Sequence, residues 1–315
     1  MTRPIAALTG ATGFLGRHIA RALEDAGFRV RILIRRETPS AEEIGPASEL
    51  VFGDLANEEA LAHLVGDAEV TVHAAGLVKA RRPEDFLQVN VEGSRRLALA
   101  MARGAPDARL VLVSSITARE PALSAYGASK AAAEAAVRQV LKPDRYTIVR
   151  PPAIYGPGDR ETLALFKAVR TLPIAPLAGG PEARVAMIHV DDAAAQVSAI
   201  AGRPAEGATY TLADARPEGY AWIEIMQAAA RAMNRRPRFV QLPRAGVLAI
   251  GRLGGALGGI GGRTPMITLG KAREMLHADW SVAAHERLPS PPTHRFDLDG
   301  GFAHAVAWYR SHHWL

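Results

Sequence analysis

The stretch that decides the fold lies near the amino terminus, where an apolar run, Ile5-Ala6-Ala7-Leu8, is followed at once by Thr9-Gly10-Ala11-Thr12-Gly13-Phe14-Leu15-Gly16. The apolar run predicts a short buried strand, and the residues after Gly13 predict a helix that ends at Gly27. A glycine triad alone is a weak signal, but a triad between a strand and a helix is typical of a dinucleotide-binding loop. In such a loop Gly10 permits the tight turn, Gly13 lets the backbone approach a pyrophosphate, and Gly16 allows close packing of helix on sheet. The alternative is a glycine-rich turn that binds nothing.

Further strand-like runs follow at regular intervals and alternate with helical segments. The runs are Arg29–Ile34, Leu50–Phe52, Val70–His73, Leu110–Val113 and Thr147–Val149. Helices are predicted from Asn57, from Pro83 to Arg103, and from a Ser124 cap to Leu141. Strands that alternate with helices predict parallel βαβ units, and right-handed crossovers then favour a doubly wound parallel Rossmann sheet of the α/β class.

The regular alternation of strands and helices ends after Arg150, and this change predicts two regions. Residues 1–150 would form the dinucleotide-binding core. Residues 151–315 would complete that core, with one more strand at Val185–His189, and would form a smaller C-terminal substrate-binding region.

Composition excludes several function classes. The chain has 315 residues, of which 48% are hydrophobic and 22% charged, as in ordinary soluble globular proteins. The absence of cysteine excludes disulfides, thiolate catalysis and cysteine metal sites. The net charge of +6 comes without an array of basic and aromatic residues, so we expect no nucleic-acid partner. We also expect no metal.

Two segments bear on targeting. The amino terminus lacks the features of a signal peptide, and we expect a cytoplasmic protein. The stretch Gly246–Gly262 is apolar but contains Arg252 and many glycines, so we expect no membrane span there. A mobile flap, or a helix packed closely against a neighbour, is the better interpretation.

The end of the second strand predicts which cofactor binds. NAD-binding proteins usually place an acid there to accept hydrogen bonds from the ribose. This sequence has Arg35-Arg36 instead, and the nearest acid is Glu37. Two guanidinium groups can bind a 2′-phosphate, which favours NADP(H), with NAD as the alternative. The two arginines could also simply lie on a loop.

A catalytic pair is predicted on the helix that Ser124 begins. Tyr126 and Lys130 are four residues apart and therefore share one face. A phenol with a pKa of about 10 is a poor base, but a nearby ammonium group stabilises its phenolate and makes proton exchange with an alcohol or carbonyl oxygen feasible. The fifth strand ends in Ser114-Ser115 at the sheet edge where ligands bind, and a serine hydroxyl there can bind the substrate oxygen.

Together these features resemble the extended branch of the short-chain dehydrogenase/reductase superfamily, the NAD-dependent epimerase/dehydratase family. This branch includes sugar-nucleotide epimerases, dihydroflavonol reductases and 3β-hydroxysteroid dehydrogenases. Its marks cover nearly the whole chain: the glycine loop, Gly53-Asp54-Leu55, His73-Ala74-Ala75, Asn90-Val91-Glu92-Gly93, Val113-Ser114-Ser115, Tyr126-Gly127-Ala128-Ser129-Lys130, Arg150-Pro151-Pro152-Ala153-Ile154-Tyr155-Gly156-Pro157 and His189-Val190-Asp191-Asp192.

The resemblance implies a role for each matching residue. Tyr126 would be the acid/base, Lys130 would modulate its pKa and bind ribose, and Ser115 would donate to the substrate oxygen. The remaining implied cofactor contacts are the loop residues Gly10, Thr12, Gly13, Phe14, Leu15 and Gly16, then Asp54 and Leu55 at the adenine, Ala74 and Ala75 at the pyrophosphate and ribose, and Pro151 and Ile154 near the nicotinamide carboxamide. By the same resemblance Asn90, His189 and Asp192 belong to the scaffold, and the helices that bear Asn90 and Tyr126 form a homodimer interface.

The chain also departs from the sugar-nucleotide enzymes. Only ten residues separate Ser115 from Tyr126, and Ile116-Thr117-Ala118-Arg119 stands where those enzymes have Val-Tyr-Gly. Thr117 could therefore share or replace the role of the serine. Arg184 is one residue away from the arginine that clamps a diphosphate in those enzymes. The double arginine, by contrast, resembles the dihydroflavonol-reductase side of the branch.

We therefore expect an NADP(H)-dependent oxidoreductase that interconverts a carbonyl and an alcohol on a small substrate of apolar, lipid- or terpenoid-like character. The apolar character follows from the aliphatic residues of the C-terminal region, which could instead simply pack the core. Two alternatives stay open. One is a nucleotide-sugar epimerase or dehydratase with tightly bound NAD, and the other is a non-catalytic cofactor-sensing or structural protein.

Overall fold

The computed structural model describes residues 3–35, 49–260 and 267–315. The chain forms two compact units. The first consists of Met1–Arg150, Ala194–Thr211 and Leu288–Pro292, and the second of Pro151–Ala193, Leu212–Arg287 and Thr293–Leu315.

The first unit is built on a seven-stranded sheet in the order β11-β6-β5-β4-β1-β2-β3, and every neighbouring pair is parallel. The strands are β1 (Ile5–Thr9), β2 (Arg29–Ile34), β3 (Glu49–Phe52), β4 (Val70–His73), β5 (Arg109–Val113), β6 (Tyr146–Arg150) and β11 (Thr209–Thr211). This arrangement confirms the predicted doubly wound α/β fold. The strand order reverses between β1 and β4, and ligands bind at the carboxyl ends of the strands at such a point.

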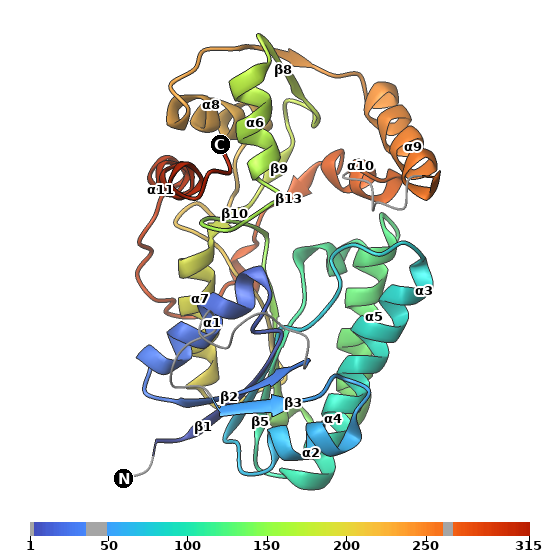
Figure 1. Ribbon diagram of the computed structural model, residues 1–315, viewed down its shortest axis with the longest axis vertical. Coiled ribbons are helices and arrows are strands. Elements are labelled where there is room, and N and C mark those ends of the chain that lie inside the picture. The colour runs from blue at the N-terminus through green and yellow to red at the C-terminus, as the bar shows by residue number, and fades with distance from the viewer. Residues whose placement is uncertain (1–2, 36–48, 261–266) are drawn as a thin grey trace. The chain divides into compact units, whose positions relative to one another are not determined.

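Helices cover both faces of this sheet (Figure 1). On one face lie α1 (Phe14–Asp25) and α7 (Val190–Ala201), joined by a hydrogen bond from the Ser198 hydroxyl to the Ala22 carbonyl. On the other lie α2 (Glu58–Val65), α4 (Gly93–Gly104) and α5 (Ala125–Val140). Both faces of β1 are buried because its residues alternate between the two helix layers.

The predicted helix caps are present. The Asn57 side chain accepts from the Ala60 N–H, and the Ser124 hydroxyl accepts from the Gly127 N–H. Gly27 has φ +92°, a conformation that other residues rarely adopt, and it ends α1 as expected.

The predicted helix from Pro83 to Arg103 is not uniform. It begins as α3 (Pro83–Phe86), widens into a π-helical segment η2 (Leu87–Glu92), and continues as α4. Asn90 lies within the π-helical segment. Such segments are often found at functional sites.

The second unit contains short parallel strand pairs and helices. The pairs are β7 (Ala153–Tyr155) with β10 (Met187–His189), β8 (Ile174–Leu177) with β12 (Arg238–Gln241), and β9 (Arg184–Val185) with β13 (Asp279–Trp280). The helices are α6 (Leu163–Thr171), α8 (Trp222–Ala232), α9 (Arg244–Ile260), α10 (Leu269–Met275) and α11 (Leu298–Ser311). The strand predicted at Val185–His189 is divided at Ala186, because β9 and β10 pair with different partners.

The glycine-rich stretch after Arg244 forms helix α9, which packs on α10. A β-carbon on Gly251 would lie 2.8 Å from the Ala272 β-carbon, and one on Gly254 would overlap the Ile267 carbonyl. The glycines therefore allow the close helix contact that the sequence suggested. Within the described residues, no helix is long and apolar enough to cross a membrane.

Candidate active site

The glycine loop folds tightly against the residues that follow β4. Gly10 has φ +81°, and a β-carbon there would lie 2.5 Å from the Ala75 nitrogen. The Gly13 N–H donates to the Gly10 carbonyl over 3.0 Å, and a β-carbon on Gly16 would overlap that same carbonyl. The structure thus brings Gly10, Gly13 and Gly16 together with Ala74-Ala75.

This loop fits a pyrophosphate. Gly13 is the first cap of the twelve-residue helix α1, and its first turn contains no acidic residue that would repel an anion. Thr12 and Gly13 are exposed, whereas Phe14 and Leu15 are half-buried. A helix amino terminus offers free N–H groups and a positive dipole end, and only a glycine lining lets a ligand come close to them.

The residues predicted at the adenosine lie at the adjacent ends of β2 and β3. Arg35 is exposed directly after β2, and the Gly53 N–H donates to the Ile34 carbonyl over 2.9 Å. Asp54 is exposed and accepts from the Ala56 N–H, while Leu55 packs beside Gly93 of α4. The structure therefore brings Arg35, Asp54 and Leu55 to one edge. Arg36 lies outside the described residues.

A buried chain of hydrogen bonds holds the loop after β4, which packs against the glycine loop. The Ala75 N–H donates to the Thr9 hydroxyl, which donates to His73 Nδ1 over 2.6 Å. His73 Nε2 then donates to the Ser94 hydroxyl, which donates to the Asn90 carbonyl. Because the Ser94 proton is used in the bond to Asn90, the neutral His73 ring must carry its proton on Nε2 and accept at Nδ1. Burial, with a smaller contribution from the charge of Lys130, lowers the pKa of His73 to about 3, so this imidazole stays neutral.

The Asn90 side chain connects the loop after β4 to helix α5. Its carbonyl accepts from the Leu77 N–H over 2.7 Å, and its amide donates to the Leu77 carbonyl and to the Ser129 hydroxyl. Ser129 in turn donates to the Tyr126 carbonyl. Asn90 is 2% exposed and fully hydrogen-bonded, which agrees with a scaffold role.

Lys130 lies between the loop that follows β4 and the end of β5. Its Nζ donates to the Val113 carbonyl over 2.8 Å, and a β-carbon on Gly76 would be 3.6 Å from that nitrogen. Burial lowers the pKa of Lys130 to about 8, and the charge of Glu134 acts in the opposite direction. The ammonium group is thus held beside the place predicted for the cofactor.

Ser115, Thr117 and Tyr126 meet at the start of α5. The Thr117 hydroxyl donates to the Ser115 hydroxyl over 2.9 Å, which leaves the Ser115 proton available for another acceptor. A β-carbon on Gly127 would lie 2.8 Å from the Thr117 carbonyl, so the serine loop and the tyrosine helix are in close contact. Tyr126 is half-buried beside Phe86, with ring centroids 6.1 Å apart.

Sequence reasoning missed the residue that ties these elements together. Glu134, 1% exposed, accepts from the Ser114 hydroxyl over 2.6 Å and binds Arg150 through both carboxylate oxygens. It thereby joins α5 to the carboxyl ends of β5 and β6. No local signal marked this residue, because a single acid in an alanine-rich helix reveals neither its burial nor its partners.

The other predicted residues belong to the second unit. Ile154 lies in β7 opposite Ile188, and Pro151 comes just before that strand. Their role beside the nicotinamide stays a prediction. The Asp192 carboxylate accepts from the Arg295 and Phe296 N–H groups, as befits a scaffold residue.

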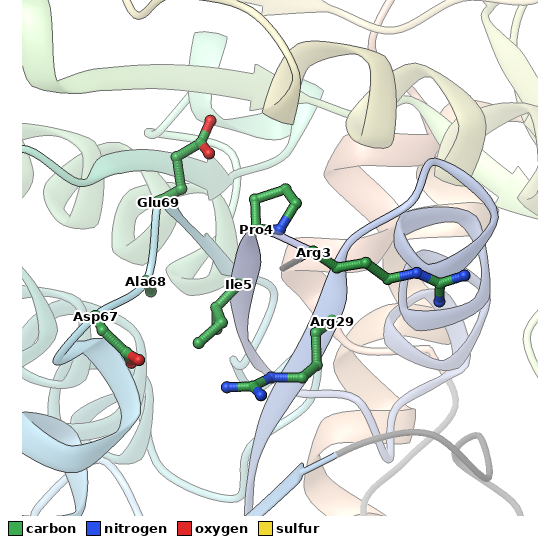
Figure 2. Close-up of a pocket in the computed structure, with 7 residues that line it drawn as sticks. All are labelled: Arg3, Pro4, Ile5, Arg29, Asp67, Ala68 and Glu69. Atoms are coloured by element: carbon green, nitrogen blue, oxygen red, sulfur yellow. The ribbon is translucent and has the colours of Figure 1, made fainter. Parts of the chain in front are cut away.

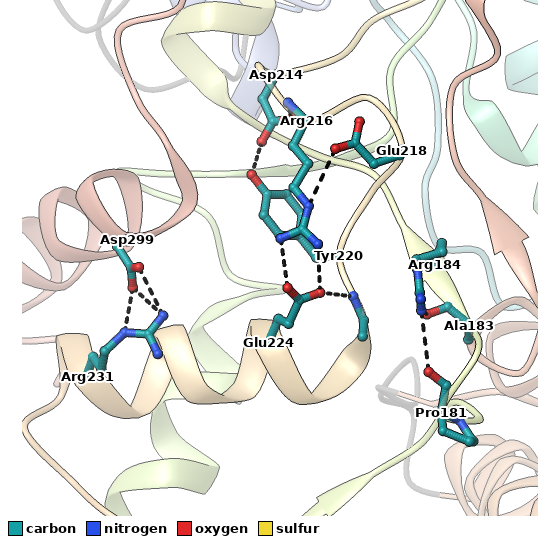
Figure 3. Close-up of polar contacts among 11 residues, drawn as sticks. Pro181, Ala183, Arg184, Asp214, Arg216, Glu218, Tyr220, Glu224, Arg231 and Asp299 are labelled. Atoms are coloured by element: carbon teal, nitrogen blue, oxygen red, sulfur yellow. Dashed lines mark hydrogen bonds and ion pairs between the residues drawn. The ribbon is translucent and has the colours of Figure 1, made fainter.

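Two further residues that the sequence singled out, His189 and Arg184, also contact residues of the second unit. His189 is fully buried and packs against Phe296, with ring centroids 3.9 Å apart and the two rings tilted. Arg184 donates to the carbonyls of Pro181 and Ala183 (Figure 3).

A hollow of about 600 Å³ lies elsewhere on the first unit (Figure 2). Its lining includes Arg3, Ile5, Arg29 and Glu69, which lie at the amino-terminal edge of the sheet. Ligands of parallel sheets bind at the opposite edge, so this hollow is not the candidate site.

Comparison with known proteins agrees with this geometry. Residues 6–213 match the family model described as NAD dependent epimerase/dehydratase family. The chain belongs to this family. It is therefore an NAD(P)-dependent oxidoreductase of the extended short-chain type, as the sequence predicted.

Two curated relatives and one solved structure are informative. The ceramide reductase of Caulobacter vibrioides is 47% identical over 99% of this chain and 96% of its own length. The 4-hydroxy-2-methyl-3-oxo-4-farnesyl-3,4-dihydroquinoline-1-oxide ketoreductase of Stigmatella aurantiaca is 31% identical over 67% of this chain and 68% of its own. The crystal structure of gox2253 has a TM-score of 0.76 at 23% identity and covers 99% of both chains, which shows the shared fold.

Proposed function

We propose that this enzyme uses NADPH to reduce a ketone on a ceramide-type lipid to the secondary alcohol. One observation supports this most strongly: the buried Lys130 ammonium donates to the Val113 carbonyl at the end of β5 and lies beside Gly76 in the loop after β4, one helical turn after Tyr126. The lipid substrate is supported by the ceramide reductase, which is similar over its full length.

Tyr126 would be the proton donor. When bound, the nicotinamide cofactor supplies the hydride that reduces the carbonyl carbon. Tyr126 gives its phenolic proton to the substrate oxygen, and the Lys130 cation stabilises the phenolate that results. The half-buried setting of Tyr126 leaves it accessible while limiting competing water.

Ser115 would hold the substrate oxygen, with Thr117 as its positioning residue. Since the Thr117 hydroxyl already donates to Ser115, the serine proton can point to the ketone. We therefore expect Ser115→Ala to lower kcat more than Thr117→Val. The opposite order would give Thr117 the direct contact.

The preference for NADPH is supported by Arg35 at the end of β2, in the place where NAD enzymes usually have an acid. We expect Arg35→Ala to raise the KM for NADPH at least about tenfold, because a charged hydrogen bond to the 2′-phosphate is lost. The KM for NADH should hardly change. Equal effects on the two cofactors would contradict this role.

The variant Tyr126→Phe tests the proposed reaction. With a detergent-dispersed ketone lipid, kcat should fall at least about a hundredfold because proton transfer is lost. NADPH affinity, measured by fluorescence titration, should be preserved. Tyr210→Phe changes a half-buried tyrosine of β11 in the same unit and serves as the control.

The epimerase alternative predicts a different result. An epimerase would retain NAD through purification and would show no net oxidation of NADPH. Turnover of nucleotide sugars alone, or full activity of Tyr126→Phe, would refute the proposed reaction.

A further inference from the structure

Acidic residues are absent from one long segment of the second unit. Between Ile225 and Arg273 the sequence has nine Lys and Arg and no Asp or Glu. The whole chain has 38 basic and 32 acidic residues, which leaves 29 basic against 32 acidic elsewhere. The positive charge, which looks scattered along the chain, is therefore concentrated in this segment.

Within the described residues, most arginines of this segment have no carboxylate partner. Elsewhere in the second unit Arg216 binds Glu224, and within the segment Arg231 binds Asp299 (Figure 3). By contrast, five exposed arginines form no ion pair with any residue that the structure describes: Arg235, Arg236, Arg238, Arg244 and Arg252. Their charges are available to a partner.

Exposed apolar side chains accompany these arginines. Ile174 is 53% exposed, Val240 48%, Ile250 47% and Leu253 63%. Scattered exposed apolar residues are ordinary, but a group with unpaired cations points to a contact surface. We call Ile174, Val240, Ile250 and Leu253, with Arg238, Arg244 and Arg252, the basic apolar strip.

The β8–β12 pair presents part of this strip. Ile174 is the register partner of Arg238, and Pro176 is the partner of Val240. Register partners in a parallel pair point to the same face of the sheet, and all four residues are exposed. This face thus presents Arg238 beside the apolar Ile174, Pro176 and Val240.

Helix α9 follows β12 after two residues and presents the rest. Its Gly251 lies against α10, which packs on this helix (Figure 1), and its Gly254 lies against Ile267, just before α10. Ile250 and Leu253 are three residues apart on the exposed side. Arg244 and Arg252 are exposed on the same helix.

We propose that the basic apolar strip docks the enzyme on an anionic lipid bilayer. Arginines attract anionic headgroups, and exposed aliphatic side chains between them enter the boundary with the acyl chains. The combination of unpaired cations with apolar groups, in a segment without any Asp or Glu, matches that boundary. The inference rests on the proposed function in one respect, since a ceramide-type substrate resides in a bilayer.

Vesicle sedimentation tests this surface directly. The full chain should bind vesicles of phosphatidylcholine mixed with phosphatidylglycerol, but not phosphatidylcholine alone. Binding should weaken in about 1 M sodium chloride, where the Debye length is about 3 Å. Exchange of Arg238, Arg244 and Arg252 for Gln should lower the partition coefficient about a hundredfold, at about fivefold for each arginine.

Two comparison variants make the test specific. Leu253→Ser should weaken vesicle binding without a change of net charge. Exchange of Arg21, Arg103 and Arg310 for Gln removes the same charge from exposed positions outside the strip and should leave binding unchanged. No binding by the unaltered chain, equal loss in this control, or a strip variant that only changes the oligomeric state would overturn the proposal.

Failure of the docking surface and failure of the proposed reaction give different results. Strip variants should keep the full kcat for a detergent-dispersed substrate, because the Tyr126 site is untouched. Tyr126→Phe should bind vesicles like the unaltered chain. If the chain binds vesicles but has no reductase activity, the proposed reaction is refuted and the proposed docking surface is not.

Discussion

The hydroxyl groups of Ser115 and Thr117 show how the structure orients side chains that the sequence could only name. The sequence left open which of them contacts the substrate oxygen, because spacing alone cannot orient a hydroxyl group. In the folded chain the Thr117 hydroxyl donates to Ser115 over 2.9 Å, which is the reason for proposing Ser115 as the group that contacts the substrate oxygen. Gly127 lets the Thr117 loop approach α5, a tertiary contact that spacing along the sequence does not reveal.

Lys130 leads to a pH prediction at the same scale. Its pKa is lowered to about 8 by burial, so the cation proposed to support the Tyr126 phenolate is present below that pH and lost above it. We expect kcat/KM for the ketone to fall on the alkaline side with an apparent pKa of about 8, since this ratio reports groups of the free enzyme.

Replacement by arginine is the matched comparison. The Lys130→Arg variant cannot lose its charge in this range, so its profile should lack the alkaline fall even if its activity is lower. A profile of the unaltered enzyme that stays flat well above pH 8 would speak against the role of Lys130.

At the scale of elements, the glycine loop depends on contacts between backbone groups. Gly16 of α1 lies so close to the Gly10 carbonyl that a β-carbon cannot fit. We expect Gly16→Ala to cost about 1–3 kcal/mol of stability and to weaken NADPH binding, because α1 must move away from the loop.

Gly104 provides the control for this substitution. It ends α4, and a β-carbon there would meet nothing within 4 Å. Gly104→Ala should therefore leave stability and NADPH affinity close to those of the unaltered enzyme. Thermal unfolding and fluorescence titration of both variants measure the difference, and equal effects would rule out the packing argument.

Most elements around the loop could be predicted from the sequence, because each has local signals. Asn57 and Ser124 begin helices as their side chains suggest, and Gly27 ends one. The π-helical segment at Leu87–Glu92 could not be predicted, since it depends on Asn90 binding Leu77 and Ser129 far along the chain. Glu134 was missed for the same reason, as its partners are tertiary.

At the scale of the whole molecule, predictability differs between the two units. The first unit has long βαβ repeats, so the parallel sheet follows from alternation and is confirmed. The second unit has strands of two to four residues with partners far along the chain, and no local pattern sets such pairs. The homodimer and the cytoplasmic location stay predictions.

The units can be followed separately during unfolding. All four tryptophans, Trp222, Trp280, Trp308 and Trp314, belong to the second unit. Tryptophan fluorescence therefore reports on that unit, whereas far-ultraviolet circular dichroism reports on both. This difference makes a stability prediction for the first unit measurable.

His73 should make the first unit sensitive to acid. Its pKa is about 3 in the folded chain but about 6.5 when unfolded, so between these values the unfolded chain binds more protons and acid favours unfolding. From pH 7 to 5 the loss is about 2 kcal/mol, seen in urea titrations by circular dichroism. His73→Gln should remove this part of the pH dependence, whereas His63→Gln, at an exposed position of α2, should not. If the His73 variant keeps the full acid sensitivity, the neutral imidazole between Thr9 and Ser94 is not its source.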